Sequence, residues 1–176
     1  MRQDKTAELL GVGLCLLFLI SGCSGLFEFQ GVVNVSPEDD AWRQGGALQA
    51  HLGFSEEAES PLIGGGASIK VEVTETYGSL EQGVHGFFLN ELDERWALYG
   101  RLGGLAGMDP VGMQQFSLTT FLQFGSMYAV DDEQTHCISF GAHTQYSAIF
   151  DNALQHGPWF GLYVGYGDWW ASRRNW

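Results

Sequence analysis

Apolar and polar residues alternate with a period of two through most of the chain after residue 25. Successive side chains of a β-strand point to opposite faces, so this alternation is typical of strands with one apolar face. Clusters of Gly, Asp, Asn and Pro, which favour turns, separate the alternating runs. The pattern predicts strands at about residues 26–35, 46–54, 67–78, 84–90, 95–104, 115–130, 136–150 and 158–170.

The connections between these runs are short and helical periodicity is almost absent, which favours pairing of neighbouring strands in chain order. We therefore predict an all-β protein, a single antiparallel meander β-barrel of about eight strands after an N-terminal signal helix. Gly64-Gly65-Gly66 precedes a strand rather than a helix. It is interpreted as a flexible turn, because a phosphate cradle places its glycines at a helix start.

The polar faces of the predicted strands are small and neutral, rich in Gly, Ser, Thr and Gln. A strand surface that faces water usually carries many Lys and Glu residues. Lys70 is the only lysine after residue 22, and it shares a strand face with Glu72. This composition favours a narrow barrel lumen in which a few charges pair, with the apolar faces turned outward to lipid.

The first 23 residues carry the features of an export signal. Arg2 and Lys5 precede an apolar run from Leu9 to Ile20, which has the length of a signal-peptide core. A helix that spans a bilayer needs about 20 apolar residues, so this run is too short. The run ends in Leu19-Ile20-Ser21-Gly22-Cys23, which resembles the lipobox of bacterial lipoproteins.

The lipobox resemblance implies cleavage before Cys23, with Ile20, Ser21 and Gly22 as the cleavage motif. It also implies a diacylglycerol on the Cys23 thiol and an acyl chain on its amine. Two or more chains, at about 0.8 kcal/mol per buried methylene, form a stable membrane anchor. In Gram-negative lipoproteins, an Asp directly after the cysteine tends to hold the protein at the inner membrane. This position is Ser24 here, so the resemblance implies the outer membrane. The predicted organisation is a signal peptide (1–22), a lipid-anchored N-terminal segment with the first strand (23–45) and a β-barrel domain (46–176).

The chain from Trp96 onward resembles small bacterial outer-membrane β-barrel proteins, as the segments 95–104 and 161–167 illustrate. The residues before Trp176 break the alternation that usually leads into the final aromatic residue of such barrels. The resemblance implies membrane lipid around the barrel exterior and envelope proteins as partners. Aromatic residues near the strand ends are interpreted as interfacial girdles: Trp96, Tyr128, Phe150, Trp159, Trp169 and Trp170.

The formal net charge of −13, from 21 acidic and 8 basic residues, excludes nucleic acid as a partner. The acidic residues gather between the strands, and Asp131, Asp132 and Glu133 form a candidate cation-binding loop. Cys15 belongs to the signal peptide and Cys23 carries lipid, so Cys137 remains as a lone thiol without a disulfide partner. We expect it to be inert in the barrel interior.

The five histidines show no spacing typical of a zinc site, and they are His51, His85, His136, His143 and His156. On strand 136–150, His136 and His143 face opposite sides because they differ by an odd number. No His-x-Ser or Gly-x-Ser-x-Gly motif is present. We therefore predict no metal, no cofactor other than the lipid on Cys23, and no catalysis.

Three hypotheses for function follow from these patterns. The first is a structural or interaction protein, a lipid-anchored barrel of the outer membrane. The second is a soluble barrel or sandwich on a lipid anchor that binds a small apolar ligand, although the Gly-x-Trp of lipocalins is absent from the first strand. The third is an enzyme that modifies envelope lipid, which would need a His/Ser/acid cluster assembled across strands.

Overall fold

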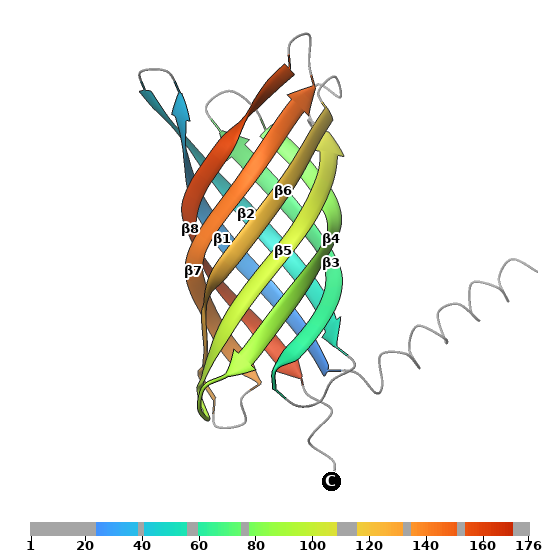
Figure 1. Cartoon of the computed structure of the whole chain (residues 1–176), viewed down its shortest axis with the longest axis vertical. Coiled ribbons are helices and arrows are strands. Elements are labelled where there is room, and N and C mark those ends of the chain that lie inside the picture. The colour runs from blue at the N-terminus through green and yellow to red at the C-terminus, as the bar shows by residue number, and fades with distance from the viewer. Residues whose placement is uncertain are drawn as a thin grey trace, which may run out of the picture.

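A computed structural model of the chain describes residues 24–38, 41–55, 60–74, 78–108, 116–131, 135–150 and 154–170. These residues form a closed barrel of long, tilted strands (Figure 1). The strands are β1 (Ser24–Glu38), β2 (Ala41–Ser55), β3 (Leu62–Thr74), β4 (Gly78–Glu91), β5 (Trp96–Met108), β6 (Phe116–Ala129), β7 (His136–Phe150) and β8 (Leu154–Trp170).

Each strand pairs antiparallel with its neighbours in the chain, and pairing of β1 with β8 closes the barrel. The predicted eight-stranded antiparallel meander is therefore confirmed. The predicted signal helix lies outside the described residues. Among the residues that are described, no helix is long and apolar enough to cross a membrane.

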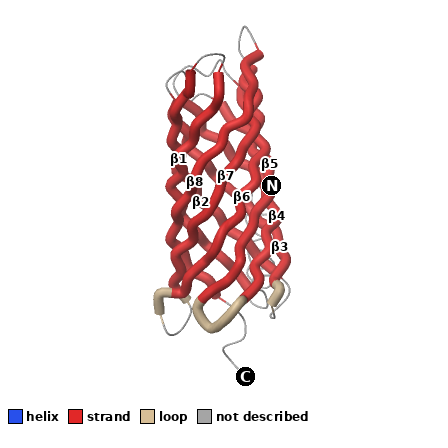
Figure 2. Tube along the Cα trace, turned by 60° about the vertical axis from the view of Figure 1, so that its left-hand side comes forward, coloured by secondary structure: helices blue, strands red, loops and turns tan. Residues whose placement is uncertain are grey.

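The antiparallel order divides the connections between two ends of the barrel, as both views show (Figures 1 and 2). β1 starts and β8 finishes at the same end, which we call the terminal end. It also carries the connections 56–61, 92–95 and 130–135, whereas the opposite end, called the loop end, carries 39–40, 75–77, 109–115 and 151–153. The connections are short at both ends, so long strands make up most of the barrel.

The barrel turns its charged side chains inward and its apolar side chains outward. Five charged side chains of the described strands are buried in the lumen: Glu28, Lys70, Glu72, Glu81 and Arg101. The outward positions expose large apolar side chains, among them Val33, Leu48, Val84, Leu102 and Leu162. A barrel that folds in water has the opposite arrangement, because burial of apolar surface drives its folding.

Glycine residues create room for aromatic side chains inside the lumen. The ring of Phe87 lies over Gly53 and Gly64, where an added Cβ would stand 2.6 Å and 2.7 Å from its Cε1 atom. The interpretation of residues 64–66 as a flexible turn is therefore wrong, since they lie within β3 and pair with β2 or β4. Glycine clusters suggest turns in a sequence, but here Gly64 lies within a strand and leaves room for a bulky ring in the narrow interior.

Two of the residues expected in the aromatic girdles belong to the interior instead. Trp159 is only 4% exposed, and its ring lies 3.3 Å from the Cβ position of Gly45 in the lumen. Trp169 packs against the buried apolar cluster at the terminal end. Both numbers are odd, and the odd positions of β8 face inward, so their assignment to the exterior is wrong. Trp96, Tyr128 and Phe150 do point outward, near the strand ends.

Candidate functional site

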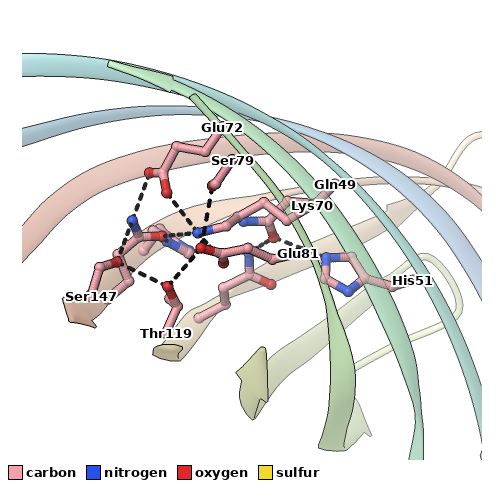
Figure 3. Close-up of polar contacts among 11 residues, drawn as sticks. Gln49, His51, Lys70, Glu72, Ser79, Glu81, Thr119 and Ser147 are labelled. Atoms are coloured by element: carbon pink, nitrogen blue, oxygen red, sulfur yellow. Dashed lines mark hydrogen bonds and ion pairs between the residues drawn. The ribbon is translucent and has the colours of Figure 1, made fainter. Parts of the chain in front are cut away.

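The lumen holds a hydrogen-bonded network that includes two ion-paired centres. In the first centre, near the loop end, the ammonium group of Lys70 lies 2.7 Å from Glu72 Oε2 and 2.8 Å from Glu81 Oε2. All three side chains have zero exposure to solvent. The sequence prediction that Lys70 and Glu72 pair inside the barrel is confirmed, and Glu81 is a second carboxylate on the same cation (Figure 3).

Neutral polar groups surround this first centre (Figure 3). Gln145 Nε2 donates to Glu72 Oε1 at 2.6 Å, and Thr119 Oγ1 donates to Glu81 Oε1 at 3.1 Å. Ser79 Oγ donates to the same Glu81 oxygen at 3.2 Å. Buried charges need such partners because isolated charges in a low-dielectric interior are costly.

The second centre lies nearer the terminal end. Arg101 Nη2 lies 2.9 Å from Glu28 Oε2, which also accepts a hydrogen bond of 3.2 Å from the Tyr99 hydroxyl. Ser139 Oγ donates to the other carboxylate oxygen of Glu28. Arg101 lies on β5 and Glu28 on β1, so the pair spans the lumen between strands that are not adjacent.

Glutamine side chains connect the two centres. Arg101 Nη1 donates to Gln123 Oε1 at 3.2 Å, and the Gln123 amide nitrogen lies 3.2 Å from His143 Nδ1. His143 Nε2 lies 3.1 Å from Gln145 Oε1, and Gln145 contacts both Lys70 and Glu72. A continuous path of polar contacts therefore joins Glu28 to Lys70 through the middle of the barrel.

Three histidines that are far apart in the sequence come together in the lumen. Ser68 Oγ lies 2.8 Å from His51 Nδ1 and 2.7 Å from His85 Nδ1. His51 Nε2 donates to Gln49 Oε1 at 3.0 Å, so a consistent assignment has Ser68 donating to His51 and His85 donating to Ser68. The third histidine, His143, stacks on Phe121, which also contacts His51.

This histidine cluster is the main feature of the interior that sequence analysis missed. His51 is opposite Ser68 in the β2–β3 register, and His85 reaches Ser68 from β4. The cross-strand His/Ser arrangement thus exists, but its three side chains are at most 5% exposed. Within the described ranges, no group of three or more His, Cys, Asp or Glu residues could hold a metal ion.

Apolar side chains fill the lumen at the terminal end. Each of these residues lies within three positions of the strand terminus at that end: Leu26, Leu62, Leu89, Ala97, Tyr99, Met127, Cys137 and Trp169. Cys137 is 2% exposed, and its thiol contacts the Gly167 carbonyl oxygen at 3.4 Å. The lumen at the terminal end is therefore mainly apolar, and the polar network lies between this apolar layer and the loop end, where buried apolar side chains such as Leu105 and Trp159 also occur.

The lumen is filled rather than open. A water-filled channel would leave its lining side chains accessible, whereas Glu28, Lys70 and Gln123 in the middle of the lumen have zero exposure. The described side chains close the barrel from the apolar layer to Trp159 near the loop end. This arrangement lacks the water-filled lumen of porin-type barrels, and its polar middle is unsuited to an apolar ligand.

The lipidation motif lies outside the described residues, which begin at Ser24, one position after Cys23. Ile20, Ser21 and Gly22 therefore also lie outside them, as do Asp132 and Glu133 of the candidate cation-binding loop. Asp131 is described, and its carboxylate organises the turn between β6 and β7. It accepts hydrogen bonds from the Thr135 hydroxyl and, at 3.0 Å, from the His136 amide.

The hydrogen bond from Thr135 lowers the pKa of Asp131 below its usual value, with smaller contributions from backbone amides. The Thr135→Val substitution removes the hydroxyl, so we expect the pKa of Asp131 to rise toward the ordinary value. In the native chain, the stabilisation from this ionised group is present above the pKa of the unfolded state. It is lost as the pH falls through the lowered pKa. An NMR titration of the Asp131 carboxyl in micelles measures the shift, with Thr120→Val as the control; an unchanged pKa would contradict the assignment.

Comparisons with known proteins support the fold. No protein-family model and no curated protein matches the sequence. Three chains among the solved structures match. One is the crystal structure of Neisserial surface protein A (NspA), with a TM-score of 0.58 and 12% sequence identity, covering 82% of this chain and 96% of that chain. At this identity, the likeness concerns the fold alone, and the resemblance to small eight-stranded barrels is confirmed in that respect.

Proposed function

We propose that this chain is an outer-membrane lipoprotein whose β-barrel spans the membrane and serves a structural or interaction role in the cell envelope. The observation that carries the proposal is the inverted distribution of side chains. Charged groups in the middle of the described strands are in the lumen, and the outward positions there are largely apolar and exposed. In lipid this arrangement places apolar side chains against hydrocarbon, whereas in water it would expose a large apolar surface.

Two further features support membrane insertion. Each strand has at least 13 residues, and a tilted strand of about 9–11 residues crosses a bilayer. Aromatic residues occupy outward positions near both ends, such as Trp96 and Tyr128 at the terminal end and Phe116 and Phe150 at the loop end. Such girdles are typical of membrane barrels.

The filled lumen supports a role without transport or catalysis. Buried ion pairs and the apolar layer occupy the space that a channel would need. The side chains of the His51–Ser68–His85 cluster are buried, with at most 5% exposure. We therefore propose that the function lies in the anchor, the exterior and the connections rather than inside the barrel.

The lipid anchor on Cys23 and the barrel are separable by experiment. We expect a Cys23→Ala variant, given an ordinary cleavable signal, to remain in the outer-membrane fraction and to resist a carbonate wash, because the barrel itself is in lipid. Immunoblots of periplasmic extract and washed membrane measure the partition. The native chain, labelled with radioactive palmitate, tests the anchor in parallel.

Recovery of the Cys23→Ala variant as a folded monomer in periplasmic extract would overturn the membrane-spanning barrel. Retention of the variant with no palmitate on the native chain would overturn the lipoprotein part alone. The two parts of the proposal are thus tested separately.

A further inference from the structure

At the terminal end, a hollow of about 290 Å³ lies between the connection 92–95 and the apolar layer of the lumen. Its inner lining is apolar and includes Met127 on β6, Cys137 on β7 and Trp169 on β8. The side chains of Met127 and Cys137 are buried, and that of Trp169 is partly buried. The hollow therefore extends from the final strand of the barrel to the turn between β4 and β5.

The rim of this hollow at that turn is acidic. Asp93 and Glu94 are exposed there, next to Glu91 at the end of β4. Among the described residues that line the hollow, Arg95 alone is basic. Asp93 Oδ1 accepts hydrogen bonds of 2.8 Å from the amides of Arg95 and Trp96, so the turn fixes the position of this carboxylate. A carboxylate has about four lone-pair sites, so Asp93 retains the capacity to accept from a further donor.

Few basic residues of the chain lie near this rim. Six of the eight basic residues follow residue 22: Arg43, Lys70, Arg95, Arg101, Arg173 and Arg174. Lys70 and Arg101 are buried in ion pairs of the lumen, and Arg43 lies at the loop end. Apart from Arg95, which belongs to the turn itself, the cations at the terminal end are therefore the two arginines that follow β8.

The segment 171–174 has the sequence Ala-Ser-Arg-Arg and follows directly on the strand that lines the hollow. An extended chain advances about 3.3–3.6 Å per residue, so Arg173 and Arg174 come about 10–14 Å after Trp170. The start of β5 is three strands from β8, which is about 14 Å along the wall at about 4.8 Å per strand. Arginine suits both parts of the hollow, because its methylene stem packs on apolar surface while its guanidinium pairs with carboxylates at the rim.

We propose that the segment 171–174 docks in this hollow across the terminal end of the barrel, with Arg173 and Arg174 paired to Asp93 and Glu94. Both surfaces belong to one chain, and this raises their effective concentration and favours a contact that would be weak between separate molecules. The docked segment shields the apolar lining of the hollow from water. The connections at the terminal end face water whether lipid or water surrounds the strands, so the inference does not rest on the membrane-spanning barrel proposed above.

Cross-linking within one chain tests this contact. In the full chain in isolated membranes, Asn175→Cys is combined either with Leu92→Cys at the acidic rim or with Val130→Cys. Leu92 and Val130 are both exposed, and Val130 is nearer to β8 in strand order. We expect a short bis-maleimide reagent to join residue 175 to residue 92 severalfold more than to residue 130, as measured by mass spectrometry of joined peptides from the monomeric gel band. The unsubstituted chain reports any reaction of its own thiols, and Cys137 is buried.

Charge substitutions in the chain with cysteines at positions 92 and 175 test the ion pairs. Glu94→Arg or Arg174→Glu alone is expected to lower the linking severalfold, and the two together are expected to restore it, because the opposite charges are then exchanged. Arg43→Gln at the loop end removes a cation elsewhere and should leave the linking unchanged. Linking to residue 92 that does not exceed linking to residue 130, or that the charge substitutions leave unchanged, would overturn the docking in chains with the gel mobility of the folded barrel. Neither result bears on membrane insertion, which the carbonate wash tests separately.

Discussion

Replacing Lys70 with methionine is expected to cost about 3–5 kcal/mol of unfolding free energy, the usual penalty for breaking a buried ion pair. Two carboxylates, those of Glu72 and Glu81, would remain without their cation in a part of the lumen with zero exposure. Neither water nor a mobile counter-ion has room to replace the ammonium group. Urea unfolding in micelles or lipid vesicles, followed by the gel mobility of folded and unfolded forms, measures the loss.

A neutral version of the same site is the decisive control. Combining Lys70→Met with Glu72→Gln and Glu81→Gln removes both stranded charges and retains hydrogen-bonding groups, so we expect most of the lost stability to return. Arg95→Met removes a cation from an exposed turn, where its contact with Tyr128 is 3.3 Å, and should cost at most about 1 kcal/mol. A Lys70→Met variant as stable as the native chain would contradict the ion-paired centre.

The sequence sufficed for the number of strands and, in the strands whose two faces it distinguished, for the side that faces the lumen, with Trp159 and Trp169 on β8 as exceptions. Both follow from local alternation, because adjacent side chains point in opposite directions whatever the neighbouring strand is. The pairing of Lys70 with Glu72 could be predicted for the same reason, since residues two apart on a strand share a face. The contact of Glu81 with this pair depends on how β4 pairs with β3, so it could not be predicted from the sequence.

The histidine cluster could not be predicted because it depends on register. His51, Ser68 and His85 lie on three strands, and a shift of one residue in either hairpin would turn their side chains to opposite faces. The lengths of the connections 56–61 and 75–77 help to set this register. These lengths follow from the bounds of the strands, which the sequence predicted only approximately. The prediction of a turn at residues 64–66 was wrong for a related reason, since the room that Gly64 leaves is occupied by Phe87 of the neighbouring strand.

The layered interior clarifies where function can reside. A polar network that spans the lumen specifies the packing of strands that are distant in sequence, and the apolar layer excludes water at the terminal end. The inside of the barrel therefore contributes rigidity, while the outward faces of the strands carry a few polar side chains, among them Gln44, Gln82, Thr120 and Thr144.

The Val164→Arg substitution separates a membrane barrel from a soluble one by the size of its effect. Val164 points outward in the middle of β8 and is 59% exposed. In lipid, an arginine near the bilayer midplane costs about 2–4 kcal/mol. In water, the same change at an exposed position would stay within about 0.5 kcal/mol. Reversible folding into lipid vesicles at increasing urea concentrations measures the difference.

Ile138→Arg is the matched control because it introduces the same charge on the outward face of β7, two residues from the terminal end. Its neighbours across the strands are Tyr128 and Tyr166, at the level of the aromatic girdle, where an arginine reaches the interface. The cost there is about 0–1 kcal/mol. A large loss at Val164 with a small loss at Ile138 is a depth dependence that only a bilayer produces, whereas equal small losses would mean that water surrounds both residues.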